Sequence, residues 1–484
     1  MAHMPPLADP ELFREAACIG GRWRTSERRI TVTNPSTGEA LGTVPDLGHA
    51  ETTEAIDAAS AAFPAWSALP AVERSDRLDA WHRALLESAD DLARLMTLEQ
   101  GKPLAEARGE IAYGASFLRW FAEEARRVSG ETVPAPTADR RILVLRQPIG
   151  VAAAITPWNF PNAMLARKVG PALAAGCTMV VKPSELTPFS ALAMAVLAER
   201  VGIPPGVFNV VTGHPGPIGD AIIESPVVRK LSFTGSTRVG KLLMERSAAT
   251  LKRLSLELGG NAPFLVFDDA DLDKAIAGVM ASKFRNAGQT CVCANRILVQ
   301  DGVYDAFAAR LTAAVGQLVV GDGLEAGVTI GPLINQAAVE KVLGHVDDAR
   351  TLGAAATVGG HRHARGGLFV EPTVLTGVTP RMRVAGEETF GPVAPLFRFR
   401  TEDEGIALAN DTPFGLAAYF YTEQLRRSWR VAERLEYGMV GLNTGSVSME
   451  MAPFGGIKES GFGREGSRHG IDEYLQLKSF HVGL

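Results

Sequence analysis

Short apolar runs alternate with segments of helical length between about residues 150 and 267. The runs that have the length and composition of buried strands are Val151–Ile155, Met179–Val181, Val207–Val211 and Leu231–Phe233. The segments with helical length and apolar spacing are Asn162–Ala175, Phe189–Val201 and Thr237–Ala248. This alternation predicts a parallel sheet with helices on both faces and ligands beyond the carboxyl ends of its strands.

A second alternating block extends from about Gly259 to Tyr437. Its expected helices are Lys274–Arg285 and Tyr304–Leu318, and its expected strands are Arg296–Val299, Ala356–Gly360 and Phe369–Leu375. We interpret this block as a second α/β domain. Between the N-terminal region and the first block, Arg127–Gln147 is proline-rich and then β-rich, which predicts a protruding hairpin. Tyr474–Val482 is expected to add an edge strand to that hairpin or to another subunit.

Composition narrows the class of protein. A chain of 484 residues with 46% apolar and 21% charged residues is typical of a soluble protein of two or three domains. The net charge of −5 comes without a basic block, so neither nucleic acid nor a membrane surface is an expected partner. No secretory signal pattern is present, and four cysteines are too few for a disulfide framework, so a cytoplasmic location is expected. The nine histidines show no metal-ligand spacing, so no metal is expected.

Two motifs contain groups suited to covalent and acid–base chemistry. Gly288–Cys293 places Cys291 in a glycine-containing loop, where a positive field would make its thiolate a strong nucleophile. A cysteine considered alone is more often a small buried apolar residue. Leu256–Gly260 surrounds Glu257 with apolar residues and glycines, which favours a raised pKa and a general base. The alternative is an acidic residue that merely ends a strand.

Three further motifs follow expected strands. Thr156–Pro161 places Asn159 where its amide could donate to a developing oxyanion, although an Asx turn before a helix would look the same. Lys182–Glu185 follows a strand in a position to meet a nucleotide. Gly235–Gly240 opens a helix whose N–H groups could hold a pyrophosphate, but it lacks the GxGxxG fingerprint.

The order and spacing of these motifs together resemble the aldehyde dehydrogenase superfamily. The matching segments cover nearly the whole chain and are Glu99–Pro103, Pro157–Pro161, Phe233–Thr237, Leu256–Gly260, Gly288–Cys291, Glu388–Pro392 and Pro453–Gly456. The resemblance implies an α/β fold with a Rossmann-type cofactor domain, an α/β catalytic domain and a small β oligomerisation arm. It also implies a homodimer or homotetramer.

On this resemblance the domains are expected at defined positions. The cofactor domain would comprise residues 1–126 and 148–258, and the catalytic domain residues 259–437. The arm would comprise residues 127–147 and 470–484, and residues 438–469 would return to the cofactor domain and the substrate pocket.

The resemblance also implies roles for individual residues. Cys291 would attack the aldehyde, Asn159 and the Cys291 N–H would hold the oxyanion, and Glu257 would activate water to hydrolyse the thioester. The positions that match cofactor contacts are Trp158, Lys182, Pro183, Ser184, Glu185, Gly235, Ser236, Leu258, Glu388 and Phe390. Glu185 would accept hydrogen bonds from the ribose hydroxyls of NAD and repel the 2′-phosphate of NADP, so NAD is the expected preference and NADP remains possible.

Within the superfamily the chain is most similar to succinate-semialdehyde dehydrogenases. Arg167, Arg285 and Ser448 match positions that bind the far carboxylate of the substrate, and Cys293 matches a cysteine that in some members forms a reversible disulfide with the nucleophile. Two guanidinium groups near a nucleophile are unfavourable in a pocket unless an anion is present, which favours a carboxylated aldehyde. Glutarate semialdehyde, one methylene longer, is an alternative substrate because a methylene contributes only ~1–3 kcal/mol.

Three other classes of function are alternatives for this sequence. Relatives that transfer the acyl group to coenzyme A tend to lack the glutamate that corresponds to Glu257. A catalytically silent member would be expected to have lost Cys291, Glu257 or Asn159, and all three are present. A cysteine hydrolase needs a histidine beside the nucleophile, and no histidine motif indicates one.

Overall fold

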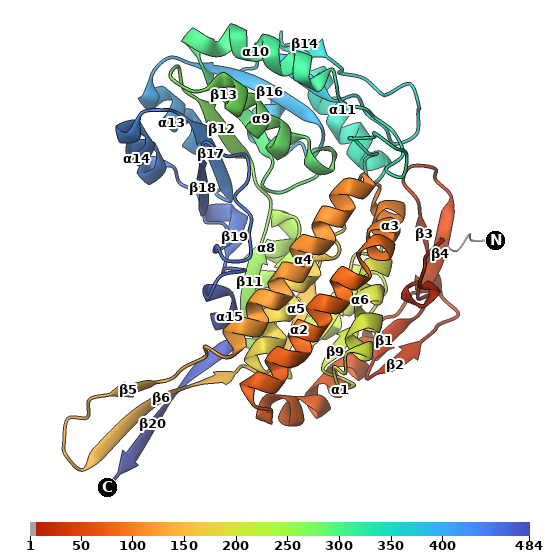
Figure 1. Cartoon of the computed structure of the whole chain (residues 1–484), viewed down its shortest axis with the longest axis vertical. Coiled ribbons are helices and arrows are strands. Elements are labelled where there is room, and N and C mark those ends of the chain that lie inside the picture. The colour runs from red at the N-terminus through yellow and green to blue at the C-terminus, as the bar shows by residue number, and fades with distance from the viewer. Residues whose placement is uncertain (1–5) are drawn as a thin grey trace.

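The computed structural model describes residues 6–484, so the first five residues of the expected cofactor domain lie outside the described part of the chain. Two large sheets, of eight and seven strands, form two helix-covered bodies that are stacked along the long axis (Figure 1). A three-stranded arm projects from the lower body. This is the α/β architecture that the alternating pattern predicts.

The eight-stranded sheet has the order β19-β11-β10-β7-β8-β9-β1-β2. Its parallel centre consists of β7 (Val151–Ile155), β8 (Thr178–Lys182), β9 (Phe208–Val210), β10 (Val228–Thr234) and β11 (Arg253–Glu257). Antiparallel strands complete the edges: β1 (Ala17–Ile19), β2 (Arg22–Arg24) and β19 (Gly461–Phe462). The four expected strands are confirmed, and nearly all of their residues are buried because helices cover both faces of the sheet.

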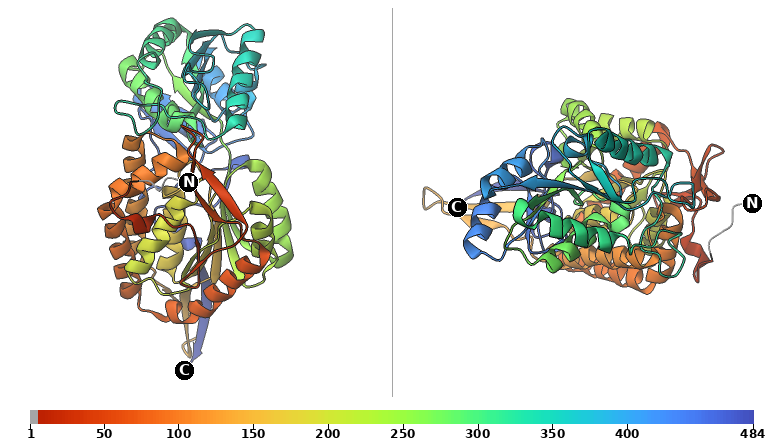
Figure 2. Two further views of the ribbon diagram at one scale, coloured as in Figure 1. Left: turned by 90° about the vertical axis from the view of Figure 1, so that its right-hand side faces the viewer. Right: turned by 90° about the horizontal axis from the view of Figure 1, so that it is seen from above.

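Two layers of helices cover one face of this sheet. The inner layer is α5 (Ala163–Ala175) and α6 (Phe189–Arg200), and the outer layer is α2 (Ala71–Glu87), α3 (Ala89–Gln100) and α4 (Leu104–Ala125). On the opposite face lie α1 (His49–Ala68), α7 (Pro215–Glu224) and α8 (Thr237–Ser247). Figure 2 shows the two helical layers from the side. A separate small hairpin, β3 (Arg29–Thr33) and β4 (Ala40–Pro45), packs near the N-terminus.

The strand order of the first sheet reverses at β7. Strands β8 and β9 follow on one side of it, whereas β10 and β11 lie on the other. Such a reversal opens a crevice beyond the carboxyl ends of the two central strands. The segments that leave β7 and β10 at this point contain the Asn159 and Gly235 motifs.

The seven-stranded sheet has the order β14-β15-β16-β13-β12-β17-β18. The strands are β12 (Ala262–Val266), β13 (Ala294–Gln300), β14 (Ala355–Val358), β15 (Thr373–Thr376), β16 (Val393–Phe399), β17 (Ala417–Tyr421) and β18 (Met439–Leu442). The helices are α9 (Leu272–Lys283), α10 (Asp301–Val315), α11 (Gln336–Thr351), α12 (Arg383–Gly386), α13 (Glu402–Asn410) and α14 (Leu425–Arg434). The strand expected over Phe369–Leu375 begins only at Thr373, because Pro372 has no N–H to donate.

The arm consists of β5 (Glu131–Val133), β6 (Arg140–Pro148) and β20 (Leu475–Gly483), in the order β20-β6-β5. The expected hairpin and the expected C-terminal strand are therefore confirmed and paired with each other. Before β20, α15 (His469–Asp472) packs on the first body. Within residues 6–484, no helix is long and apolar enough to cross a membrane.

Candidate active site

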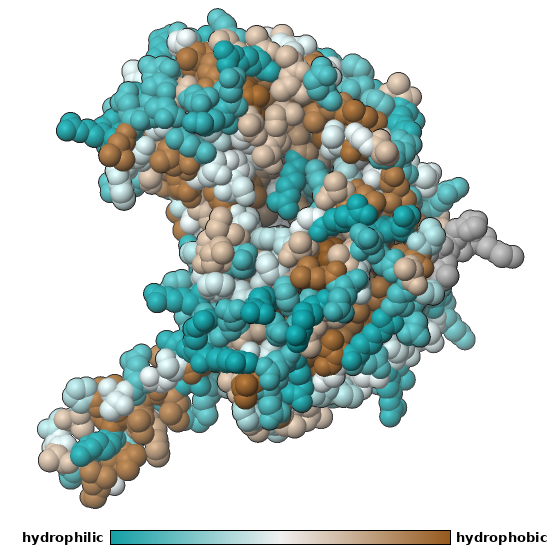
Figure 3. Space-filling model, in the orientation of Figure 1, coloured by the Kyte–Doolittle hydropathy of each residue, from teal (hydrophilic) through white to brown (hydrophobic). Residues whose placement is uncertain are grey.

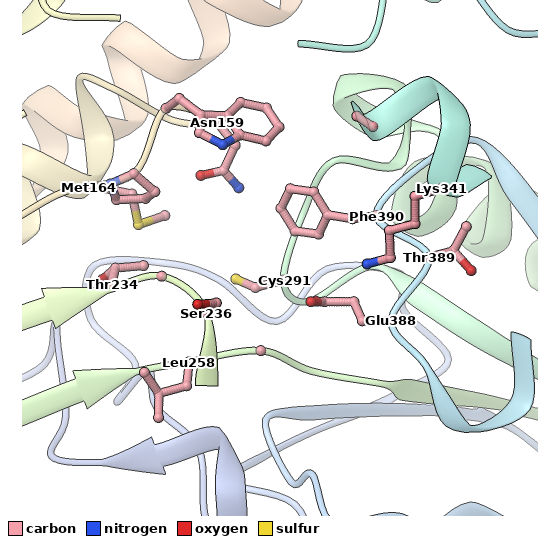
Figure 4. A pocket seen from close by; sticks show the side chains of 15 residues that line it. Asn159, Met164, Thr234, Ser236, Leu258, Cys291, Lys341, Glu388, Thr389 and Phe390 are labelled. Carbon is pink, nitrogen blue, oxygen red and sulfur yellow. The ribbon is translucent and has the colours of Figure 1, made fainter. Parts of the chain in front are cut away.

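A cleft of about 280 Å³ lies where connections from the two large sheets meet (Figure 4). The first sheet contributes the segments that follow the carboxyl ends of β7, β10 and β11. The second sheet contributes the segments that precede β13 and β16. The predicted site residues that line the cleft are Trp158, Asn159, Gly235, Ser236, Leu258, Cys291, Glu388 and Phe390.

Cys291 lies in the cleft with its sulfur directed toward the carboxamide of Asn159 (Figure 4). Burial raises the pKa of the Cys291 thiol to about 12, and the nearby charge of Arg167 opposes this shift only in part. Desolvation therefore outweighs the positive charge that would lower this pKa. A raised pKa favours the thiol form, whose proton has to leave as the sulfur attacks.

The backbone near the nucleophile adopts left-handed conformations that most residues avoid. Asn286 and Ala287 have φ values of 51° and 53°, and Phe390, on the opposite wall, has a φ of 55°. Each such non-glycine residue costs about 1–3 kcal/mol and persists only where surrounding contacts hold it. These residues thus set the shape of the loop that precedes Cys291.

Asn159 and Glu257 are both buried; Asn159 lines the cleft, whereas Glu257 does not and precedes Leu258, which does. The Asn159 Nδ2 donates a hydrogen bond to the Gln289 carbonyl at 3.0 Å, which ties the amide to the Cys291 loop. Glu257 ends β11, and neither of its carboxyl oxygens has a hydrogen-bond partner within residues 6–484. Burial, together with the charge of Glu465, raises the pKa of Glu257 well above its ordinary value. This direction matches the one expected from its apolar neighbours.

None of the predicted cofactor residues that follow β8 lines the cleft. Lys182 Nζ and Glu185 Oε2 form an ion pair at 2.6 Å. Burial opposes ionisation of Glu185, but Lys182 holds the pKa of Glu185 below its ordinary value. Pro183 and Ser184 are buried in the same turn, where the Ser184 hydroxyl accepts from the Leu186 N–H.

Polar groups suited to a dinucleotide also line the cleft. Ser236 is the N-cap of α8 and leaves the positive end of that helix facing the cleft beside Gly235. Glu388 accepts a hydrogen bond from the Gly260 N–H at 3.2 Å, and burial raises the pKa of Glu388 to about 7. Trp158 and Phe390 meet edge to face across the cleft. This donor and acceptor set fits a phosphate and a ribose.

Arg167 forms an ion pair with a protein carboxylate, which the sequence did not predict. Its guanidinium group contacts Glu465 at 2.6 Å, and both side chains are buried. Glu465 also pairs with Lys168, and Arg167 stacks over the ring of Phe454 at 3.7 Å. A protein carboxylate already balances the charge of Arg167, so its burial does not by itself require a substrate anion, and its role in substrate binding stays a prediction.

Arg285, Ser448 and Cys293 lie near the cleft but do not line it. Arg285 is half-buried over the ring of Phe160 at 4.8 Å, and it forms no ion pair with the residues that the structure describes. The Ser448 hydroxyl is hydrogen-bonded to the Tyr113 hydroxyl. Cys293 is buried, and Lys283 Nζ donates to its sulfur at 3.4 Å.

Sequence reasoning missed several lining residues. They are Pro157, Met164, Thr234, Gly259, Ala338, Lys341 and Thr389. Pro157, Thr234 and Thr389 lie beside residues already singled out, so adjacency could have indicated them. Lys341 comes from an exposed part of α11, and Figure 4 shows its amine near Glu388. In the described part of the chain, no group of three or more acidic, His or Cys side chains is arranged to hold a metal ion.

Comparison with known proteins gives consistent matches over the full length. The model of the aldehyde dehydrogenase family matches residues 23–480. The succinate-semialdehyde dehydrogenase [NADP(+)] of Escherichia coli is 62% identical over 480 residues, which cover 99% of this chain and 100% of that protein. The glutarate-semialdehyde dehydrogenase of Pseudomonas aeruginosa is 60% identical and covers 99% of each chain. A crystal structure of succinate-semialdehyde dehydrogenase from Burkholderia pseudomallei superposes with a TM-score of 0.98, at 62% identity, over 99% of this chain and 100% of that one.

Proposed function

Because this chain belongs to the aldehyde dehydrogenase family, we propose that it oxidises succinate semialdehyde to succinate with NAD or NADP as the electron acceptor. The observation that carries the proposal is the arrangement of the cleft, in which the Cys291 sulfur and the Asn159 carboxamide face one space (Figure 4). The names of the similar proteins supply the substrate class.

The first half of the reaction uses Cys291 and Asn159. The Cys291 sulfur adds to the aldehyde carbon and loses its proton to solvent, and Asn159 Nδ2 donates to the oxygen that becomes negative. Donors fixed before the reaction stabilise such an oxyanion without reorganisation. A bound nicotinamide dinucleotide supplies the two-electron acceptor that converts the adduct to a thioester.

The second half uses Glu257. Its buried carboxylate removes a proton from the water that attacks the thioester carbon, and the carboxylate product leaves as Cys291 regains its proton. A base that lacks hydrogen-bond partners and has a raised pKa is suited to this transfer near neutral pH. The presence of Glu257 favours hydrolysis over transfer to coenzyme A. No histidine lines the described part of the cleft, which disfavours a cysteine hydrolase.

The cofactor would lie between Trp158, the N-terminus of α8 and Glu388. We further propose that the enzyme prefers NAD to NADP, and that this preference depends on Glu185. A carboxylate near the adenosine ribose would repel the 2′-phosphate of NADP. The ion pair with Lys182 offsets part of that charge, so we expect the discrimination to be modest. The similar E. coli protein is named for NADP(+).

The substrate carboxylate would contact Arg285, whose guanidinium group forms no ion pair with the residues that the structure describes. Ser448 would add a hydroxyl donor, and the unpaired Nε and Nη1 of Arg167 could donate as well. Glutarate semialdehyde is the second candidate, because the P. aeruginosa relative carries that name and the two substrates differ by one methylene.

The three-stranded arm is proposed to hold subunits of a homodimer or homotetramer together. It exposes Val133, Leu145, Leu477 and Phe480 along its length, and Figure 3 shows apolar surface on the arm. The division into cofactor, catalytic and arm domains at the boundaries given above is likewise proposed, as is a cytoplasmic location.

Replacement of Cys291 by Ala tests the proposed activity directly. Reduced cofactor should form from succinate semialdehyde in the original enzyme and not in the variant, while both bind NAD with similar affinity. Turnover by the variant would overturn the role of Cys291, and a lack of turnover by the original enzyme with either semialdehyde would overturn the substrate class.

A further inference from the structure

A buried ion pair lies behind the loop that carries Asn159. Lys102, from the Glu99–Pro103 motif, precedes α4, and Glu110 lies on α4. Lys102 Nζ contacts Glu110 Oε2, and the two side chains are 1% and 0% exposed. Neither residue lines the cleft. Charged groups that are buried so completely are tolerated only when other groups are hydrogen-bonded to them. The other hydrogen bonds of Lys102 and Glu110 therefore indicate which part of the protein the pair supports.

Those remaining bonds all go to the Asn159 loop. Lys102 Nζ donates to the backbone carbonyl of Asn159 at 2.8 Å. Glu110 Oε1 accepts from the N–H groups of Asn162 and Ala163 at 3.0 and 3.2 Å, at the start of α5. The pair therefore holds the loop at its beginning and at its end.

Asn286 links this arrangement to the Cys291 loop. Its N–H donates to Glu106 Oε2 at 2.7 Å, and Glu106 lies one turn before Glu110 on α4. The Asn286 Nδ2 donates to the Asn159 carbonyl at 3.0 Å and to the Gln289 carbonyl at 3.3 Å. The same Asn159 carbonyl thus accepts from both Lys102 and Asn286.

We propose that Lys102 and Glu110 are positioning residues that fix the Asn159 carboxamide relative to the Cys291 sulfur. This inference rests on the proposed role of Asn159 as the oxyanion donor. Two donors on one carbonyl restrict rotation of the Asn159 peptide, and the side chain follows the backbone. A displacement of about 1 Å at such a donor is enough to lower a rate by ~100-fold.

The first test replaces both charges, so that neither is left buried and unpaired. Lys102→Met keeps the length of the side chain, and Glu110→Gln keeps a carbonyl oxygen for the two N–H groups of α5. In the double variant, kcat should fall ~10–100-fold while KM for the aldehyde and Kd for NAD stay within about threefold. The paired change Lys230→Met with Glu473→Gln is the matched control, because Lys230 is equally buried but pairs with Glu473 away from the cleft. An unchanged kcat in the double variant would overturn the proposal.

The second test asks whether the effect passes through Asn159. If it does, the double variant should lower kcat by less than about threefold in an Asn159→Ala background, because the group that it positions is already absent. If the double variant lowered kcat by the same factor with and without Asn159→Ala, the ion pair would support the fold in general. That result would overturn the positioning role but not the proposed function. If Asn159→Ala by itself left kcat unchanged, the proposed oxyanion role would fail, and the positioning role with it.

Discussion

The Arg167 guanidinium group lies 2.6 Å from the Glu465 carboxylate, and both side chains are buried. The negative charge that a buried arginine requires is thus supplied by the protein itself. Arg285, by contrast, has no ion-pair partner within residues 6–484 and lies half-buried over an aromatic ring. Two arginines that look equivalent in the sequence therefore have different surroundings, and the roles predicted for them can be separated experimentally.

Arg285→Ala should impair use of the anionic substrate selectively. Loss of one charge-assisted contact should cost ~1.5–3 kcal/mol of transition-state stabilisation, which lowers kcat/KM for succinate semialdehyde about 10- to 150-fold. Butanal, an uncharged aldehyde of the same carbon number, should lose little. Arg285→Lys should recover part of the activity because it keeps a positive charge. Equal losses with both aldehydes would contradict a role in carboxylate binding.

Arg167→Ala should act mainly on stability. Breaking a buried ion pair typically costs about 3–5 kcal/mol, and we expect the lower end because Lys168 still contacts Glu465. Chemical denaturation of the variant and of Arg285→Ala would measure the difference. The expectation fails if the two variants are equally stable.

Glu257→Gln should slow deacylation by roughly 10²–10⁴-fold, because an amide cannot accept a proton from water. Stopped-flow mixing should show a burst of reduced cofactor followed by a slow steady state. In the original enzyme the deacylation rate should fall as the pH falls through the raised pKa of Glu257, since only the ionised carboxylate acts as a base. If the deacylation rate of Glu257→Gln still fell at low pH in the same way, another group would be responsible for this pH dependence.

Glu185→Gln should shift cofactor use toward NADP. Without the carboxylate, the Lys182 ammonium group is no longer paired and can attract a 2′-phosphate. The ratio of kcat/KM for NAD to that for NADP should drop on the order of tenfold. A ratio that does not move would remove Glu185 from cofactor selection.

Cys293 is predicted to protect Cys291 from irreversible oxidation. Peroxide should inactivate the enzyme, and a thiol reductant should restore it, if the two sulfurs form a disulfide. Cys293→Ala should make most of the loss irreversible, because an oxidised Cys291 would have no resolving partner. Cys18→Ala, which changes another buried thiol, is the control. Equal recovery in the original enzyme and in Cys293→Ala would leave Cys293 with a packing role in contact with Lys283.

The sequence alone determined the elements and the order of the chemical motifs. Runs such as Val151–Ile155 and Met179–Val181 are apolar over their whole length, and a pattern of this kind is a local property. The residues Asn159, Glu257 and Cys291 were found because their motifs are contiguous. The hairpin at Arg127–Gln147 was found in the same way, from composition over a short window.

Only the tertiary structure decided which charges are free and which are balanced. Arg167 and Glu465 are far apart in the sequence, as are Lys102 and Asn159, and neither pairing leaves a local pattern. The pKa of Cys291 was also decided in this way, because desolvation depends on how completely the two sheets enclose the sulfur. Periodicity records which face of an element is buried, whereas electrostatic energies depend on distances between elements, and folding alone sets those distances.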